Sequence, residues 1–335
     1  MVKSYMGSIP QSREARVVPD HRPQTQPLFA SSGNPALDRR LDWARADLEA
    51  GDAAAAAELL TDTVGEAPGF VAAWFLLGEA RQAAGDTAGA ADAFRQARDR
   101  DPADALGAGL RLAQLGATAA EDAMSPDYVR TLFDQYAPRF DTALRDKLAY
   151  RGPEVLAAAV DAVCAARGRP ARFARALDLG CGTGLAAPLF ADKVEVLDGV
   201  DLSPAMVERA EALGLYARLE VGEMGAALEA VTPGSLDLVL AADALCYVGD
   251  LGPIFRAAQI AMASQALFAF TVETHAGEGL LLRETLRYAH AEALVRSEAS
   301  AAGLAVLTLE PRSTRTEKGA PVPGLVAVLA RSVDL

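Results

Sequence analysis

The chain has 335 residues, of which 51% are hydrophobic and 23% charged, so it can form one large or two smaller domains with buried cores. A net charge of −13, from 32 basic against 45 acidic residues, argues against binding to nucleic acid backbones and anionic membranes. Three cysteines without metal-ligand spacing argue against a disulfide framework and predict no metal site. No apolar run approaches the roughly 18 residues of a membrane span, so we expect a cytoplasmic protein.

Residues 1–35 differ in composition from the rest of the chain. Four prolines occur between positions 10 and 27, and no apolar periodicity accompanies them. Such a segment cannot bury enough surface to offset the entropy lost on ordering. We therefore expect a flexible N-terminal segment rather than a transit peptide. The alternative is that it lies along a groove of the remaining chain.

Residues 36–118 contain an internal repeat with a period of 34. The pair Gly51-Asp52 recurs as Gly85-Asp86, and the same offset separates the prolines at 68 and 102. A partial third copy from 104 to 116 is expected to form a capping helix. Since two and a half repeats leave one face open, we expect this all-α block to pack against the rest of the chain.

The second copy resembles the tetratricopeptide repeat (TPR), in which small and large apolar residues let two antiparallel helices pack closely. The residues that carry this resemblance are Trp74, Leu77, Gly78, Ala90, Phe94, Ala97 and Pro102. The role of the block stays open between recruitment of a protein partner and an appendage that stabilises or dimerises the chain.

Residues 119–150 are expected to form a linker and an amphipathic helix. Leu132, Phe133, Tyr136 and Phe140 recur at helical spacing between positions 128 and 141. By periodicity alone, this helix faces a core.

Residues 151–335 are predicted to form a doubly wound, Rossmann-like α/β domain. From Phe173 onward, short apolar runs alternate with helix-like segments, which is typical of a sheet with parallel strands. Such a sheet binds its ligand at the carboxyl ends of the strands. The residues that follow each strand are therefore the candidate binding residues.

A glycine-rich turn, DLGCGTG from Asp178 to Gly184, follows the first strand. Its three glycines let the backbone approach a ligand that side chains would exclude. Asp201, 23 residues after Asp178, ends the second strand, where a carboxylate can accept both hydroxyls of a ribose. Nicotinamide-binding folds have G-x-G-x-x-G instead, and Leu185 stands in the last place of that pattern. A dehydrogenase is therefore the less favoured interpretation.

The third and fourth predicted strands also end in candidate residues. Glu223 and Met224 suit an adenine amine and an apolar ring face, and Asp243 follows the apolar run 236–242. Because these strands end at the same edge of a parallel sheet, we expect the three side chains near Asp201.

The motifs DLGCGTG, GVDLSPAMVERA, VGEM and LDLVLAADALCYVGDL, in this order, resemble those of class I S-adenosylmethionine-dependent methyltransferases. The resemblance covers residues 128–330 and implies S-adenosyl-L-methionine as the cofactor. With the repeats in front, the whole chain resembles bacterial methyltransferases that carry an N-terminal TPR block. Two departures are the missing Pro-Gly-Gly turn before the fifth strand and Glu223 where aspartate is more frequent.

The resemblance implies roles for individual residues. Asp178 and the glycine loop would hold the methionine part of the cofactor, and Asp201 would bind its ribose. Leu202 and Met206 would flank the adenine, and the helix with Tyr136 resembles a lid segment. The full implied cofactor set is Tyr136, Asp178, Gly180, Gly182, Thr183, Gly184, Asp201, Leu202, Met206, Glu223, Met224 and Asp243.

The acceptor side is less well defined. His290, in the segment RYAH, resembles a position that faces the acceptor in related enzymes, and Tyr247 follows the fourth strand. We expect both to contact the acceptor, with His290 or Asp243 as a base if the acceptor must lose a proton. The alternatives are a solvated or supporting helix residue for His290 and a packing aromatic for Tyr247.

Taken together, the sequence predicts methyl transfer from S-adenosylmethionine to an unidentified acceptor, either a small molecule or a protein. The acidic charge disfavours a nucleic acid acceptor. The alternative is a non-catalytic interaction protein that works through its repeats and keeps a methyltransferase-like fold as a scaffold.

Overall fold

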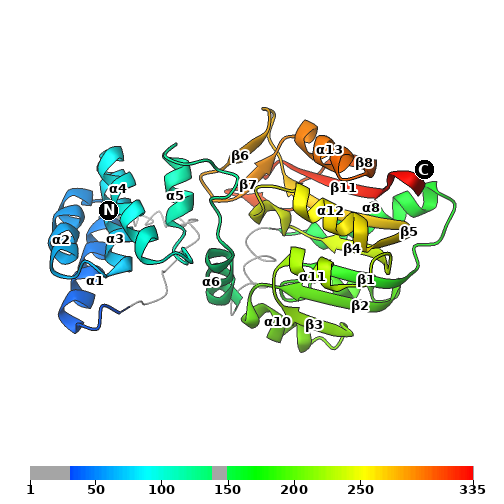
Figure 1. Ribbon diagram of the computed structural model, residues 1–335, viewed down its shortest axis with the longest axis horizontal. Coiled ribbons are helices and arrows are strands. Elements are labelled where there is room, and N and C mark those ends of the chain that lie inside the picture. The colour runs from blue at the N-terminus through cyan, green and yellow to red at the C-terminus, as the bar shows by residue number, and fades with distance from the viewer. Residues whose placement is uncertain (1–30, 138–148, 335) are drawn as a thin grey trace, which may run out of the picture.

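The computed structural model describes residues 31–137 and 149–334 and consists of a helical part joined to an α/β part (Figure 1). Residues 1–30 of the predicted flexible segment and 138–148 of the predicted lid region lie outside the described residues. The helical part lies at one end of the molecule, and α6 lies between it and the sheet (Figure 1). No helix in the part described is long and apolar enough to cross a membrane.

Helices α1 to α5 form the helical part, and α6 follows them. Gly51 and Gly85 have φ angles of +87° and +84°, in the left-handed region that favours glycine. The next residue in each copy, Asp52 or Asp86, accepts a hydrogen bond from a backbone N–H in the first turn of the following helix. The repeated Gly-Asp pair therefore ends one helix and begins the next. The bounds are α1 Pro35–Glu49, α2 Ala53–Glu66, α3 Val71–Ala83, α4 Thr87–Arg100, α5 Ala108–Gln114 and α6 Pro126–Tyr136.

The α/β part is built on a nine-stranded sheet whose main path has the order β3-β2-β1-β4-β5-β11-β8. The first five strands of this path are parallel, as predicted. Strand β11 runs antiparallel between β5 and β8, which the sequence did not indicate. The bounds are β1 Phe173–Leu179, β2 Val194–Asp201, β3 Arg218–Val221, β4 Leu236–Ala241, β5 Met262–Glu273, β6 Leu280–Leu282, β7 Tyr288–His290, β8 Leu304–Pro311, β9 Thr316–Glu317, β10 Ala320–Pro321 and β11 Gly324–Arg331.

Helices cover both faces of the sheet. On one face, α8 and α9 bury residues such as Leu156 and Phe190 against β1, β4 and β5. On the other face, α11, α12 and α13 enclose a core in which Phe255, Phe268 and Phe270 contact one another. The bounds are α8 Gly152–Ala166, α9 Ala187–Phe190, α10 Pro204–Glu211, α11 Met224–Ala230, α12 Gly252–Ala261 and α13 Glu292–Ala301, with short 3-10 turns at Leu245–Tyr247 and Ser332–Asp334. This layering confirms the predicted Rossmann-like class.

The helical part packs against the β6–β7 hairpin. Leu110 of α5 is fully buried in a cluster with Tyr128 of α6 and Leu286 of the hairpin. The side-chain amide of Gln114 donates a hydrogen bond of 3.2 Å to the backbone carbonyl of Arg283. The expected packing of the repeats against the rest of the chain is therefore observed.

Candidate functional site

The glycine turn after β1 has the backbone conformation that its glycines allow. Gly180, Gly182 and Gly184 have φ angles of +64°, +56° and +85°. A Cβ at Gly180 would lie only 2.6 Å from the Cβ of Ala244 in the loop after β4. Glycine is thus needed here both for the backbone angle and for the close approach of two loops.

Asp201 ends β2 beside this turn. One carboxylate oxygen accepts a hydrogen bond of 2.9 Å from the backbone N–H of Gly182, and the other accepts one of 2.9 Å from Ser203. Burial raises the pKa of Asp201, whereas the two N–H donors lower it. Since a carboxylate oxygen can accept more than one hydrogen bond, both oxygens retain capacity for the hydroxyls of a diol.

Asp178, near the end of β1, is 1% exposed. Burial raises the pKa of its carboxyl group to about 7, although the Tyr216 hydroxyl donates a hydrogen bond of 2.7 Å to it. Sequence analysis did not single out Tyr216, because it precedes the weakly patterned strand β3, 38 residues from its partner. Thr183 is buried in the same turn.

The predicted adenine-side residues come from the ends of β2 and β3. Leu202 is half-buried and packs against the cluster that contains Tyr128, whereas Met206 is buried within α10. Glu223 is exposed just before α11, and Met224 is the first residue of that helix. Leu202 directly follows β2, and Glu223 and Met224 follow β3, so these three residues lie at the same edge of the sheet as Asp201, and their contacts with the cofactor stay predictions.

Helix α6 is docked onto the start of α10. The Asp134 carboxylate accepts a hydrogen bond of 2.5 Å from the Ser203 hydroxyl and one of 3.4 Å from the backbone N–H of Ala205. A negative charge at a helix N-terminus is favourable. Tyr136 is the half-buried last residue of α6, and the part of the predicted lid segment from 138 onward lies outside the described residues.

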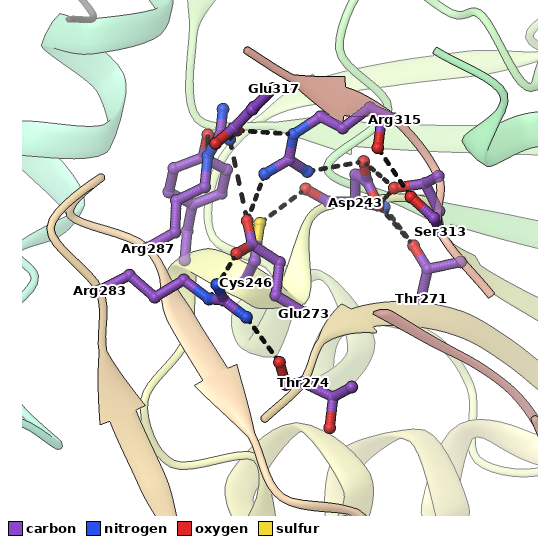
Figure 2. A network of polar contacts seen from close by, with 12 residues as sticks. Asp243, Cys246, Thr271, Glu273, Thr274, Arg283, Arg287, Ser313, Arg315 and Glu317 are labelled. Atoms are coloured by element: carbon purple, nitrogen blue, oxygen red, sulfur yellow. Dashed lines mark hydrogen bonds and ion pairs between the residues drawn. The ribbon is translucent and has the colours of Figure 1, made fainter. Parts of the chain in front are cut away.

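A network of charged side chains occupies the carboxyl ends of β4 and β5 (Figure 2). Glu273, the last residue of β5, forms ion pairs with the guanidinium groups of Arg283, Arg287 and Arg315. Arg315 is 3% exposed and also contacts Asp243 and Glu317. The three arginines and three carboxylates balance in charge, which compensates the cost of burying them.

Asp243 belongs to this network rather than standing free beside the glycine turn. Its φ angle is +53°, and its carboxylate accepts hydrogen bonds from the hydroxyls of Thr271 and Thr314 and from Arg315. Its predicted cofactor contact therefore competes with three donors of the chain itself. The left-handed backbone of a non-glycine residue here is a local strain of the kind found at functional sites.

Tyr247 and Tyr150 lie next to the network. The Tyr247 hydroxyl accepts a hydrogen bond of 2.9 Å from Arg287, and its ring packs edge-on against Phe133 of α6 with centroids 5.2 Å apart. Burial and then the charge of Asp243 raise the pKa of Tyr150 well above its usual value. Tyr150 was missed in the sequence because it is a single aromatic residue before α8, with no motif around it.

His290 is placed differently from the expectation. It lies in strand β7 rather than in a helix, is fully buried, and its Nε2 lies 3.0 Å from the carbonyl oxygen of Val248. Burial lowers its pKa to about 4. A buried imidazole whose Nε2 is held by a backbone carbonyl is poorly suited to remove a proton from an acceptor. The structure favours a role in holding the loop after β4.

Comparison with known proteins gives the two parts of the chain separate relatives. Residues 176–263 match a family described as a methyltransferase domain, and residues 47–115 match the tetratricopeptide repeat. The chain therefore combines a TPR block with a methyltransferase domain, which confirms the resemblance found in the sequence.

Named relatives cover parts of the chain only. It is 41% identical over 123 residues to methyltransferase-like protein 27 of Homo sapiens, across 36% of this chain and 49% of that protein. It is 57% identical over 49 residues to a TPR repeat-containing protein of Pseudomonas aeruginosa, across 15% of this chain and 47% of that protein. The chain thus spans about half the length of the curated relatives that it matches.

Among solved structures, one similar fold is the 1,6-didemethyltoxoflavin-N1-methyltransferase of Burkholderia thailandensis, with bound 1,6-didemethyltoxoflavin and S-adenosylhomocysteine. The alignment covers 62% of this chain and 89% of that chain, with 17% identity and a TM-score of 0.47.

Proposed function

We propose that this chain transfers a methyl group from S-adenosylmethionine to an acceptor that binds at the carboxyl ends of β4 and β5. The observation that supports this most directly is Asp201, whose two oxygens are held by Gly182 and Ser203 and can still accept a ribose diol. The match of residues 176–263 to a methyltransferase domain supports the same proposal.

The proposed site residues act by binding and alignment. S-adenosylmethionine supplies a methyl group on a positively charged sulfur, and its transfer is an in-line displacement. We propose that Asp201 holds the ribose, that the turn from Gly180 to Gly184 admits the methionine part, and that Tyr136 on α6 covers it. Holding donor and acceptor in reactive geometry contributes much of the rate enhancement, so no covalent enzyme intermediate is needed.

We propose that the acceptor lies near Tyr247, Tyr150 and the largely buried side chains of Arg283 and Arg287. Tyr247 follows β4 and Tyr150 precedes α8, while the two arginines belong to the β6–β7 hairpin and pair with Glu273 at the end of β5. An acceptor screen that measures the release of S-adenosylhomocysteine would identify the compound.

The repeats pack on the β6–β7 hairpin beside the charged network, so we propose that they hold the acceptor side of the methyltransferase domain in place. Recruitment of a protein acceptor is the second candidate role. The TPR match and the position of α5 next to the hairpin favour it. We retain the predicted division at 36–118, 119–150 and 151–335 as the working domain boundaries.

Calorimetric titration with S-adenosylmethionine tests the cofactor assignment. We expect Asp201→Ala to weaken binding about 10- to 100-fold, because charge-assisted hydrogen bonds to the ribose are lost. Glu220→Ala is the matched control, since Glu220 is a partly exposed carboxylate on β3 that pairs with Arg218. Absence of binding by the wild type, or equal binding by the wild type and Asp201→Ala, would contradict the proposal.

A further inference from the structure

Tyr216 lies in a slot that two glycines create. A Cβ at Gly184, in the turn after β1, would lie 3.1 Å from its ring. A Cβ at Gly199, in β2, would lie 2.9 Å from the same ring. Real Cβ atoms rarely approach a neighbour so closely, so glycine at both positions is what lets the ring lie between the turn and the strand. The two glycines therefore provide the space that the Tyr216 ring occupies.

The slot directs the Tyr216 hydroxyl to the carboxylate of Asp178, at 2.7 Å. The tyrosine is a donor here and stays protonated, because burial and then the charge of Asp178 raise its pKa. A donated hydrogen bond favours the ionised form of a carboxyl group, whereas burial favours the neutral form. The bond therefore opposes the effect of burial on Asp178.

We propose that Tyr216 is a positioning residue that keeps Asp178 ionised to receive the ammonium group of the cofactor, and thereby sets the lowest pH at which the site binds it. This inference rests on the proposed function. A neutral Asp178 loses its charge attraction to an ammonium group, so affinity falls as pH falls through the pKa of Asp178. Removal of the Tyr216 hydroxyl moves that fall to higher pH.

The other titratable groups near Asp178 do not stabilise its ionised form. The charge of Asp201, at the end of the neighbouring strand, raises the pKa of Asp178, although less than burial does. Cys181 in the same turn and Tyr150 before α8 also interact with Asp178, and burial holds both in the neutral form. Among these groups, the Tyr216 hydroxyl is the donor that stabilises the negative charge.

Titration of the Asp178 carboxyl carbon by NMR in the unliganded full-length protein tests the first half of the proposal. We expect a midpoint near pH 7 in the wild type, in line with its raised pKa. In Tyr216→Phe the midpoint should rise by about one unit, since a hydrogen bond to a charged group has about that effect. Gly199→Ala retains the hydroxyl but fills the slot, and it should raise the midpoint as well.

The dissociation constant of S-adenosylmethionine between pH 6 and 9 tests the second half. Tyr216→Phe should bind about fivefold more weakly than the wild type at pH 7 and almost equally at pH 9, where Asp178 is largely ionised in both. Tyr288→Phe is the matched control, because it removes a buried tyrosine hydroxyl that donates to the carbonyl of Ala120 instead. Its profile should follow that of the wild type.

Three outcomes separate this proposal from the proposed function. Equal Asp178 midpoints in the wild type and Tyr216→Phe overturn the inference, and so does weaker binding by Tyr216→Phe that is the same at every pH, as a purely structural role predicts. If the wild type binds no S-adenosylmethionine at any pH, the proposed function fails, and the assigned role of Asp178 fails with it. The NMR titration then still decides whether Tyr216 controls the ionisation of Asp178.

Discussion

At the scale of single residues, burial decides what each titratable side chain of the site can do. His290 and Asp178 are both buried, and burial shifts the pKa of each toward the neutral form, downward for His290 and upward for Asp178. For His290 this form fits its contact with the carbonyl of Val248, in which Nε2 donates. For Asp178 a tyrosine hydroxyl offsets part of the effect. The position of a residue relative to a sequence motif does not reveal how burial changes its pKa.

Stability should therefore fall in acid because of His290. Its pKa is about 4 in the folded chain, below the ordinary value of 6.5, so the unfolded chain takes up the proton first. The neutral imidazole makes its full contribution to the free energy of unfolding above pH 6.5. As the pH falls from 6.5 toward 4, this contribution of about 3 kcal/mol is lost. Urea unfolding of the wild type and of His290→Gln across this range measures it. The free energy of unfolding should depend less on pH in His290→Gln than in the control His275→Gln. If it falls equally with pH in both variants, the assignment to His290 is wrong.

At the scale of elements, the docking of α6 depends on a few polar contacts. Asp134 joins α6 to the N-terminus of α10 through Ser203 and Ala205, and Phe133 packs against Tyr247. This places α6 between the predicted cofactor residues and the charged network. The helix therefore contacts both halves of the proposed site.

Asp134→Ala should weaken binding of S-adenosylmethionine several-fold and lower the free energy of unfolding by about 1 kcal/mol, because α10 loses a negative charge and a hydrogen-bond acceptor at its start. Asp127→Ala, in the first turn of α6, removes a pair with Arg130 and should cost up to about 1 kcal/mol as well, because α6 loses a negative charge at its start, but it should leave the affinity for S-adenosylmethionine unchanged. Calorimetric titration and urea unfolding measure the two effects. Equal affinities for the two variants would count against α6 as a lid.

At the scale of the whole molecule, the repeats and the sheet share one apolar cluster. Leu110 of α5 is fully buried there, together with Leu286 from the β6–β7 hairpin. The hairpin in turn carries Arg283 and Arg287, which pair with Glu273. A structural change in the repeats is thus transmitted to the proposed acceptor side through continuous contacts.

Leu110→Ala should cost about 2–5 kcal/mol of stability, the usual range for a buried leucine. It should also speed hydrogen exchange in the β6–β7 hairpin. Leu77→Ala removes an equally buried leucine within the helical part and should leave exchange in the hairpin unchanged. Mass spectrometry of exchanged peptides measures the difference. Equal protection of the hairpin in both variants would show that the cluster does not couple the two parts.

The features that could be predicted from the sequence are those that depend on residues close together in the chain. The Gly-Asp pairs at 51 and 85, the turn from Gly180 to Gly184 and Asp201 were found because turns, caps and strand ends have local patterns. The contacts of Tyr216 with Asp178 and of Arg315 with Glu273 span 38 and 42 residues. Such contacts depend on the order of the strands in the sheet, so they cannot be predicted from a local sequence pattern. The antiparallel β11 was missed for a related reason, because the short β9–β10 hairpin rather than a helix precedes it.

The position of Glu273 limits how this protein can change during evolution. This one carboxylate pairs with arginines from two separate segments, the β6–β7 hairpin and the loop after β8. Its loss alone would leave uncompensated buried positive charge, which is strongly destabilising. Replacement of Glu273 by a neutral residue should therefore be tolerated only together with replacement of an arginine, so that these distant positions covary among homologues.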